Sequence, residues 1–128
     1  MLQQITKGIK ISVETIYKKR EFRNNRIYYI FNYFVIIENN SSTPVILSER
    51  MWKIFDSLNK SKTVIGKGVI GNTPLIKPNQ SYSYSSGCIL ESNFGAMFGH
   101  YKMINTITNE ICNVNIPKFQ LTTPELSN

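Results

Sequence analysis

The sequence predicts an all-β protein, an immunoglobulin- or fibronectin type III-like β-sandwich of about eight strands. Three observations lead to this fold class. Segments that alternate between apolar and polar residues, rich in β-branched and aromatic side chains, follow one another at short spacing. Turn-forming residues separate these segments. The sequence has no long amphipathic helical pattern.

The first half of the chain contains three apolar segments. Residues 10–17 alternate in the pattern of a half-buried strand. Residues 27–38 are dominated by β-branched and aromatic residues, and polar residues interrupt the even-numbered face, which we expect to be the wetter one. A polar turn over residues 39–44 leads to the third segment, residues 45–55, which contains the only tryptophan, Trp52.

This third segment has a second interpretation, a helix over residues 47–56. We prefer a strand, because Pro44 precedes the segment and a polar turn over residues 56–60 ends it. The choice does not alter the fold class.

The second half of the sequence has the same alternation of short apolar segments and turns. A hairpin loop is expected at residues 105–109. The expected strands are residues 63–65, 81–85, 88–90, 96–104 and 111–121. Together the segments form one domain, residues 9–124, between a flexible N-terminal tail, residues 1–8, and a C-terminal tail, residues 125–128.

Composition limits the classes of protein that the chain can belong to. With 128 residues and 41% apolar residues, one core can form without disulfides or a metal. No apolar run reaches the length of about 18 residues that a membrane-spanning helix needs, so no membrane span is expected. The N-terminus lacks the pattern of a secretory signal, which predicts a cytoplasmic protein. Cys88 and Cys112 are then expected to be reduced core residues, with a disulfide as the alternative.

The motif Gly66-Lys67-Gly68-Val69-Ile70-Gly71 matches the glycine pattern of pyrophosphate-binding loops. Such a loop normally opens a helix, whose N-terminal amides face the phosphates. Pro74 and Pro78 follow too closely for a stable helix, and Glu91 lies beyond a separate strand, so it is a poor match for the ribose-binding acid. The glycines are then expected to form a loop or bulge with positive φ angles. In a weaker version of the binding hypothesis, Gly66, Lys67, Gly68 and Gly71 hold an anion without a helix.

The sequence shows no catalytic or metal-binding constellation. His100 is the only histidine, and neither cysteine nor serine stands in a nucleophile context, so we expect no enzyme. We also expect no metal site and no cofactor, because the spacings typical of metal ligands are missing. The pair Tyr82 and Tyr84 is expected to pack across strands.

A net charge of +7 permits contact with nucleic acid or with acidic partners. Residues 18–26 concentrate five cations around Phe22, and we expect them to form a solvated loop between the first two strands. The signatures of nucleic-acid-binding modules are missing, so we do not expect nucleic acid to be the partner.

Several segments, taken in order, carry a resemblance that covers about residues 9–124. They are residues 35–39, Trp52, residues 66–71 with Pro74, residues 82–87 after Pro78, residues 95–103 and residues 116–119. With these segments the chain resembles the ApaG family, also called CorD. The resemblance implies a fibronectin type III-like sandwich, a genetic link to cobalt resistance and magnesium efflux, and protein–protein contact as the role of related domains.

The expected function is therefore that of a non-enzymatic binding module with a protein partner. Whether the chain forms a homodimer is left open, because edge strands of a sandwich can pair with those of a second copy. The alternative is a nucleotide, pyrophosphate or other phosphate-containing ligand bound at Gly66–Gly71, with Lys67 beside the anion.

Overall fold

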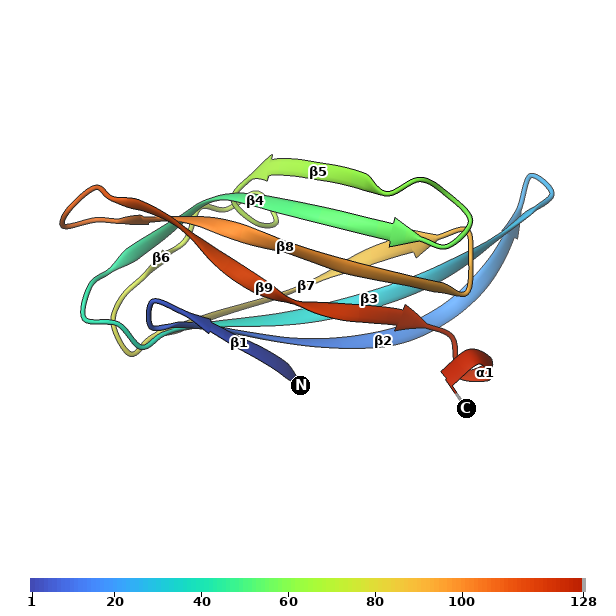
Figure 1. The fold of residues 1–128 in the computed structure, drawn as a ribbon, viewed down its shortest axis with the longest axis horizontal. Coiled ribbons are helices and arrows are strands. Elements are labelled where there is room, and N and C mark those ends of the chain that lie inside the picture. Colours follow the sequence, from blue (N-terminus) through green and yellow to red (C-terminus); the bar gives the residue numbers. More distant parts are fainter. Residues whose placement is uncertain (128) are drawn as a thin grey trace.

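The structure, a computed structural model that describes residues 1–127, is a sandwich of two antiparallel sheets (Figure 1). The first sheet has the strand order β1-β2-β3-β7, and the second has the order β5-β4-β8-β9, with β6 paired to β4. The strands are β1 (Leu2–Thr6), β2 (Ile9–Arg23), β3 (Arg26–Asn39), β4 (Val45–Asp56), β5 (Lys62–Lys67), β6 (Leu75–Ile76), β7 (Ser81–Leu90), β8 (Phe94–Asn105) and β9 (Ile111–Thr122). One helical turn, α1 (Pro124–Ser127), follows β9. The all-β sandwich predicted from the sequence is confirmed.

The inward faces of both sheets supply the core, because alternate residues of a strand point to the same face. Trp52 of β4 lies at its centre and is 3% exposed. Its ring centroid is 5.4 Å from that of Tyr33, 5.8 Å from that of Phe119 and 6.3 Å from that of Tyr101. The segment 45–55 is a strand, as preferred, and its tryptophan packs against rings of both sheets.

The expected loop over residues 18–26 is wrong. β2 and β3 continue as a two-stranded hairpin, in which Phe22 pairs with Ile27. Asn24 and Asn25 form the turn with φ angles of 49° and 63°. Two successive positive φ angles give a turn whose twist matches that of a hairpin. The alternation was not recognised because both faces of this hairpin are largely exposed, so it lacks the apolar face of a half-buried strand.

The residues expected as a free N-terminal tail, 1–8, also form structure. β1 pairs with the start of β2 through a turn at Lys7 and Gly8, whose φ angles are 50° and 81°. β1 is largely exposed, so its backbone pairing, not apolar burial, keeps it in place. Of the expected C-terminal tail, 125–128, all but Asn128 lie within α1, and Asn128 lies outside the described residues.

The remaining elements follow the sequence closely. The hairpin loop at residues 105–109 is confirmed between β8 and β9. The two strands expected at residues 81–85 and 88–90 are one continuous strand, β7, which passes through Gly87 without a break.

Candidate functional site

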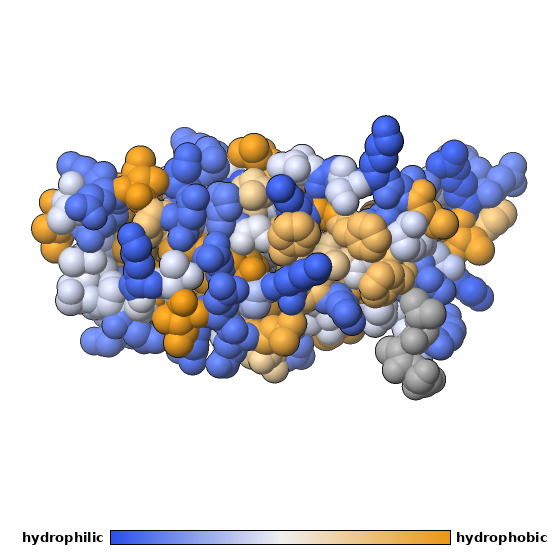
Figure 2. Space-filling model, viewed as in Figure 1, coloured by the Kyte–Doolittle hydropathy of each residue, from blue (hydrophilic) through white to orange (hydrophobic). Residues whose placement is uncertain are grey.

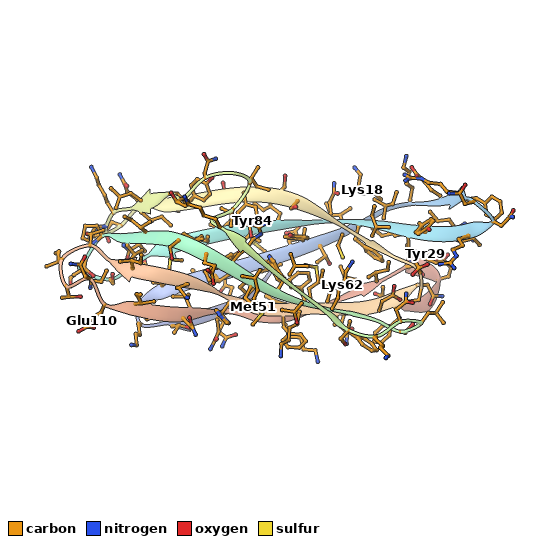
Figure 3. All side chains as sticks on the ribbon, turned by 90° about the horizontal axis from the view of Figure 1, so that it is seen from above. Lys18, Tyr29, Met51, Lys62, Tyr84 and Glu110 are labelled. Carbon is orange, nitrogen blue, oxygen red and sulfur yellow. The ribbon has the colours of Figure 1, made fainter. Side chains whose placement is uncertain are left out.

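One long side of the sandwich is closed and the other is open. On the closed side, β9 contacts β1 and β2 of the other sheet. There, the backbone N–H of Asn115 donates a hydrogen bond to Oγ1 of Thr6 over 3.3 Å. On the open side, β7 and β5 are the outermost strands of their sheets. Figure 3 looks down on this side, with Tyr84 of β7 and Lys62 of β5 labelled.

The β7 edge differs from the other edges in how little protects it. Natural edge strands are commonly guarded by charged residues, proline, bulges or shortness. β9 carries Pro117 and Lys118 next to a register shift, β5 has Lys62 and Lys67 at its ends, and β1 is only five residues long. β7 has ten residues, neither charge nor proline, and an unbroken register with β3. Its free edge is therefore open to pairing with another strand.

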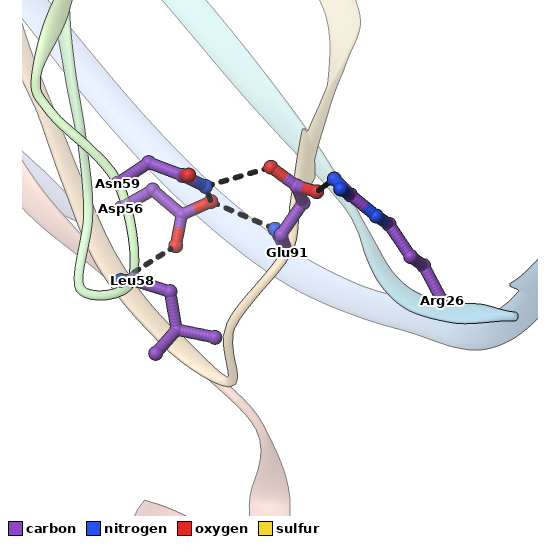
Figure 4. Close-up of polar contacts among 5 residues, drawn as sticks. All are labelled: Arg26, Asp56, Leu58, Asn59 and Glu91. Atoms are coloured by element: carbon purple, nitrogen blue, oxygen red, sulfur yellow. Dashed lines mark hydrogen bonds and ion pairs between the residues drawn. The ribbon is translucent and has the colours of Figure 1, made fainter.

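At the end of the sandwich where β4 and β7 finish, Asp56 joins two loops (Figure 4). Its Oδ2 accepts hydrogen bonds from the backbone N–H of Glu91 over 2.7 Å and from the side-chain amide of Asn59 over 3.2 Å. Its Oδ1 accepts from the backbone N–H of Leu58 over 3.3 Å and from the hydroxyl of Ser92. We call this arrangement the Asp56 junction.

The Asp56 junction extends to the β2–β3 hairpin. The side-chain amide of Asn59 donates to Oε2 of Glu91 over 2.7 Å, and Nη1 of Arg26 donates to Oε1 of the same carboxylate over 2.7 Å. Three segments far apart in the sequence are thus held together at one end of the molecule. The exposed ion pair between Arg26 and Glu91 thus links the hairpin to the end of β7.

The charge state of Asp56 follows from its surroundings. Burial raises the pKa of its carboxyl. The hydrogen bonds from Ser92, Glu91, Leu58 and Asn59 stabilise the carboxylate and outweigh this effect, so the pKa lies below its ordinary value. Asp56 is therefore ionised at neutral pH, and the junction is formed by a carboxylate.

Two cavities flank the junction. One, of about 400 Å³, opens between the end of β7 and the β4–β5 region and includes Ile89, Lys60 and Lys62 in its lining. The other, of about 570 Å³, lies against the hairpin and includes Phe22 and Leu58. Glu91 and Asn59 line both cavities, so the two are neighbours on the same end of the molecule.

The tip of the hairpin exposes apolar side chains. Phe22 is 70% exposed and Ile27 41% exposed, and the two face each other across the hairpin. Leu58, in the neighbouring loop, is 73% exposed. Exposed apolar residues that lie together, rather than singly, are a sign of an interaction surface.

A second apolar group lies on the outer face of β4 and β8 (Figure 2). The rings of Phe55 and Phe94 meet edge to face, with centroids 6.1 Å apart. Nζ of Lys118 lies 5.5 Å from the ring centroid of Phe98. Since these rings are covered in part by one another and by a lysine, this face is a weaker candidate than the hairpin tip.

The glycine motif Gly66–Gly71 ends β5 and forms a tight turn. Val69 and Asn72 exchange two backbone hydrogen bonds, of 2.8 and 2.9 Å. Between them, Ile70 and Gly71 have φ angles of 47° and 75°, and Gly68 has a φ of 58°. The positive φ angles expected for the glycine loop are confirmed at Gly68 and Gly71, and no helix follows the motif.

The amides of this turn are largely engaged. The N–H groups of Gly68, Val69 and Asn72 donate to backbone carbonyls of the protein itself. Lys67 is exposed and stands opposite Glu49 in the register of β5 with β4. A phosphate would therefore find few free donors in the backbone of the loop.

Arg50 of β4 lies against the motif. Its Nη1 donates hydrogen bonds to the carbonyl oxygens of Lys67 and Gly68 over 3.2 and 3.0 Å. Together with Gly71, Tyr33 and Ser86, among others, Arg50 lines a cavity of about 140 Å³ between the two sheets. Sequence reasoning missed this arginine, because the register between β4 and β5 brings it to the motif from a distant part of the chain.

The remaining residues singled out in the sequence have structural surroundings. His100 is half-buried and pairs with Met51 and Asn115 within its sheet. In the part of the chain that the structure describes, no three His, Cys, Asp or Glu side chains gather as metal ligands would. The same residues contain no helix long and apolar enough to cross a membrane.

Both cysteines are free thiols. Cys88 is buried in the core, while Cys112 is only half-buried and packs against it. Tyr82 and Tyr84 share the inward face of β7, and the hydroxyl of Tyr84 is hydrogen-bonded to that of Tyr101 across the core. Both tyrosines therefore pack into the core, and the hydrogen bond of Tyr84 runs to the other sheet rather than to a neighbouring strand.

The Asp56 junction was not anticipated from the sequence. Its members come from three loops or strand ends, and no periodic pattern links them. The one available signal was local: Asp56 stands between a buried strand and the polar turn that contains Asn59, a position in which aspartate side chains often bond to nearby backbone amides.

Comparison with known proteins places this architecture in a family. Residues 19–105 match the ApaG domain family, DUF525. The chain is 41% identical over 126 residues to Protein ApaG of Agrobacterium fabrum, covering 98% of this chain and 96% of that protein. It is 39% identical over 125 residues to Protein ApaG of Shewanella woodyi, covering 98% of each chain.

Solved structures agree with these relatives. The structural-genomics target SoR45 superposes with a TM-score of 0.87 at 37% identity, covering 93% of this chain and 89% of that one. The putative ApaA protein from Bordetella pertussis superposes with a TM-score of 0.83 at 32% identity, covering 91% and 94%. Since the similarity spans nearly the whole chain in sequence and in fold, this protein belongs to the ApaG family.

Proposed function

We propose that the chain is a non-enzymatic, cytoplasmic binding module that accepts an extended segment of a partner protein along the β7 edge. The observation that carries the proposal is the unguarded edge itself, ten residues long and bordered by the open side of the sandwich. Main-chain hydrogen bonds to such an edge give affinity, and side-chain pockets beside it give specificity. The cavity of about 400 Å³ at the end of β7 offers such a pocket.

A second copy of the chain is one form that the partner can take, since two β7 edges can pair in a homodimer. A partner protein is the broader case and covers any segment able to adopt an extended conformation. The genetic association of the family with cobalt and magnesium would then act through that partner rather than through a metal site of the chain.

The test uses a displayed library of random peptides, selected on the purified chain, with the best binders then made synthetically. Nuclear magnetic resonance of the labelled protein should show that a bound peptide shifts and protects amides of β7 from solvent exchange while leaving those of β9 unchanged. Only every second amide of a bound peptide faces β7. N-methylation of that set of alternate residues should abolish binding, and N-methylation of the other set should leave it intact. Perturbation of β9 alone, or failure of every peptide to bind, would remove the proposal.

The second candidate function is binding of a phosphate-containing ligand beside Gly71. The observation favouring it is Arg50, whose guanidinium lines the small cavity next to the glycine turn and has further N–H donors besides those used on the loop carbonyls. Arg50 would supply most of the hydrogen bonds to an anion held there, because most of the backbone amides of the loop already have partners.

Calorimetric titration with pyrophosphate and with ATP, each with and without Mg²⁺, tests this candidate. Gly71→Ala is the informative variant, because a Cβ at Gly71 meets nothing within 4 Å, and at its φ of 75° alanine is strained less than a β-branched residue. Saturable binding that Arg50→Met removes and Gly71→Ala weakens would establish the site. No heat of binding in the wild-type protein would dispose of it.

A further inference from the structure

The end of β7 leads directly to a surface of mixed apolar and basic character, which we call the hairpin-end surface. Its apolar members are Phe22, Ile27 and Leu58, and its basic members are Arg23, Arg26, Lys60 and Lys62. Ile89, near the end of β7, connects the strand to this surface. It is 50% exposed and lines two cavities, one shared with Lys60 and the other with Arg23. A segment lying along β7 therefore reaches this surface with one of its ends.

The charges of the hairpin-end surface are only partly neutralised. Glu21 forms ion pairs with Lys19 and Arg23, and the two cations lower the pKa of its carboxyl. Arg26 is paired with Glu91. Lys60 and Lys62 make no ion pair with any side chain that the structure describes, although both line the cavity at the end of β7.

The surface is also held in a fixed shape. The Asp56 junction ties the loop that carries Leu58 to the end of β7, and through Arg26 it reaches the hairpin. Preorganisation of this kind lowers the entropic cost of binding. Leu58 is therefore presented from a loop that the junction already holds in place.

The chemistry favours a peptide over a nucleic acid. Single-stranded nucleic acids need aromatic stacking platforms and a continuous line of cations. Here two of the three exposed apolar side chains, Ile27 and Leu58, are aliphatic, and two of the four basic members of the surface already have carboxylate partners. Aliphatic groups beside unpaired lysines suit a peptide that alternates apolar and acidic residues.

We infer that the partner segment on β7 carries both acidic and apolar residues at the end that reaches the hairpin. Its carboxylates lie near Lys60 and Lys62. Its apolar side chains pack against Phe22, Ile27 and Leu58. This inference rests on the proposed function, since it names the chemistry of the segment that β7 accepts. Electrostatic complementarity of this kind steers association and fixes register along the edge.

The test selects peptides from the same displayed library and measures their affinity by fluorescence anisotropy at low and high salt. Asp and Glu should be enriched beside Leu, Ile, Val or Phe. The double variant K60E/K62E should weaken binding roughly ten-fold at low salt and less at high salt. The matched control, K7E/K77E, makes the same change of charge at two exposed lysines in turns at the other end of the sandwich and should leave affinity unchanged.

The apolar part has its own matched pair. Leu58→Ala should weaken binding about five-fold, whereas Ile107→Ala, which truncates a similarly exposed side chain in the β8–β9 loop, should not. Both side chains are largely exposed, at 73% and 68%, so neither change threatens folding.

The outcomes separate the inference from the proposed function. Peptides that perturb β7 but show no acidic enrichment, or that bind K60E/K62E and Leu58→Ala as tightly as the wild type, overturn the inference and leave β7 as the docking edge. If no peptide binds, both fail. If a fluorescent single-stranded oligonucleotide binds instead, and K60E/K62E abolishes its binding, the surface is a nucleic-acid site and the inference is overturned.

Discussion

Replacement of Gly68 and Gly71 by alanine separates two physical effects within one turn. Both glycines have left-handed backbones, with φ angles of 58° and 75°. An alanine in that region costs about 1 kcal/mol from local strain alone. A Cβ at Gly71 would meet nothing within 4 Å, so strain is the whole cost there. Gly71→Ala should therefore reduce the free energy of unfolding by about 1 kcal/mol.

At Gly68 a second effect is added. A Cβ there would lie 1.9 Å from the carbonyl oxygen of Asn72, a backbone atom that cannot swing aside. To relieve the overlap, the carbonyl of Asn72 has to move, and this weakens the hydrogen bond that it accepts from the N–H of Val69. The hydrogen bond from the N–H of Gly68 to the carbonyl of Ser48 is disturbed as well. With about 1 kcal/mol for each hydrogen bond, Gly68→Ala should cost about 3 kcal/mol in total.

The measurement is urea unfolding followed by the fluorescence of Trp52, which is the only tryptophan and is buried in the core. Equal slopes of free energy against urea would show that only stability has changed. Equal losses in the two variants, or a loss under about 0.5 kcal/mol for Gly68→Ala, would refute the steric argument. A consequence for ligand studies is that Gly68 variants confound binding with folding more than Gly71→Ala does.

Three further outcomes follow from buried polar groups. Because the pKa of Asp56 is lowered, its carboxylate stabilises the folded state at any pH above the ordinary carboxyl pKa. This stabilisation is lost as the pH falls through the lower pKa of the folded state. Asp56→Asn should therefore flatten the decline of the unfolding free energy below about pH 4. Tyr84→Phe leaves the buried hydroxyl of Tyr101 without its hydrogen-bond partner and should lower the free energy of unfolding by about 1–2 kcal/mol. The double variant with phenylalanine at both Tyr84 and Tyr101 should recover much of this loss in thermal unfolding. Burial raises the pKa of Cys88 to about 11, so a thiol reagent at pH 8 should modify the half-buried Cys112 first and Cys88 only on unfolding, as mass spectrometry would show.

The parts of the fold that could be predicted are those in which one face of a strand is buried. β3 alternates because its inward residues meet the core, and β4 does so on either side of a register shift between Leu47 and Glu49. Both strands were predicted from the sequence within a residue or two of their bounds. The outer part of the β2–β3 hairpin has no buried face, so its strands look like a polar loop. β1 was missed for the same reason, since its pairing depends on backbone hydrogen bonds that leave no mark in side-chain pattern.

The candidate site was less accessible still. The lack of charge in β7 is visible in the sequence, but it acquires meaning only when β7 is known to be an edge, which depends on the pairing of the whole sheet. The Asp56 junction joins residues up to 65 positions apart in the chain. The glycine motif shows the opposite case: its letters suggest a phosphate loop, whereas the geometry is that of a two-residue turn.

The closed side of the sandwich has a practical consequence for how the molecule can be tethered. The first strand and the last strand meet there, and Figure 1 places the N-terminus and α1 along the same flank, away from β5. A linker, an affinity tag or a further domain attached at either end would therefore leave the flank formed by β7 and β5 unobstructed. The fold is suited to immobilisation or fusion through its termini, with the exposed strand still available to a ligand in solution.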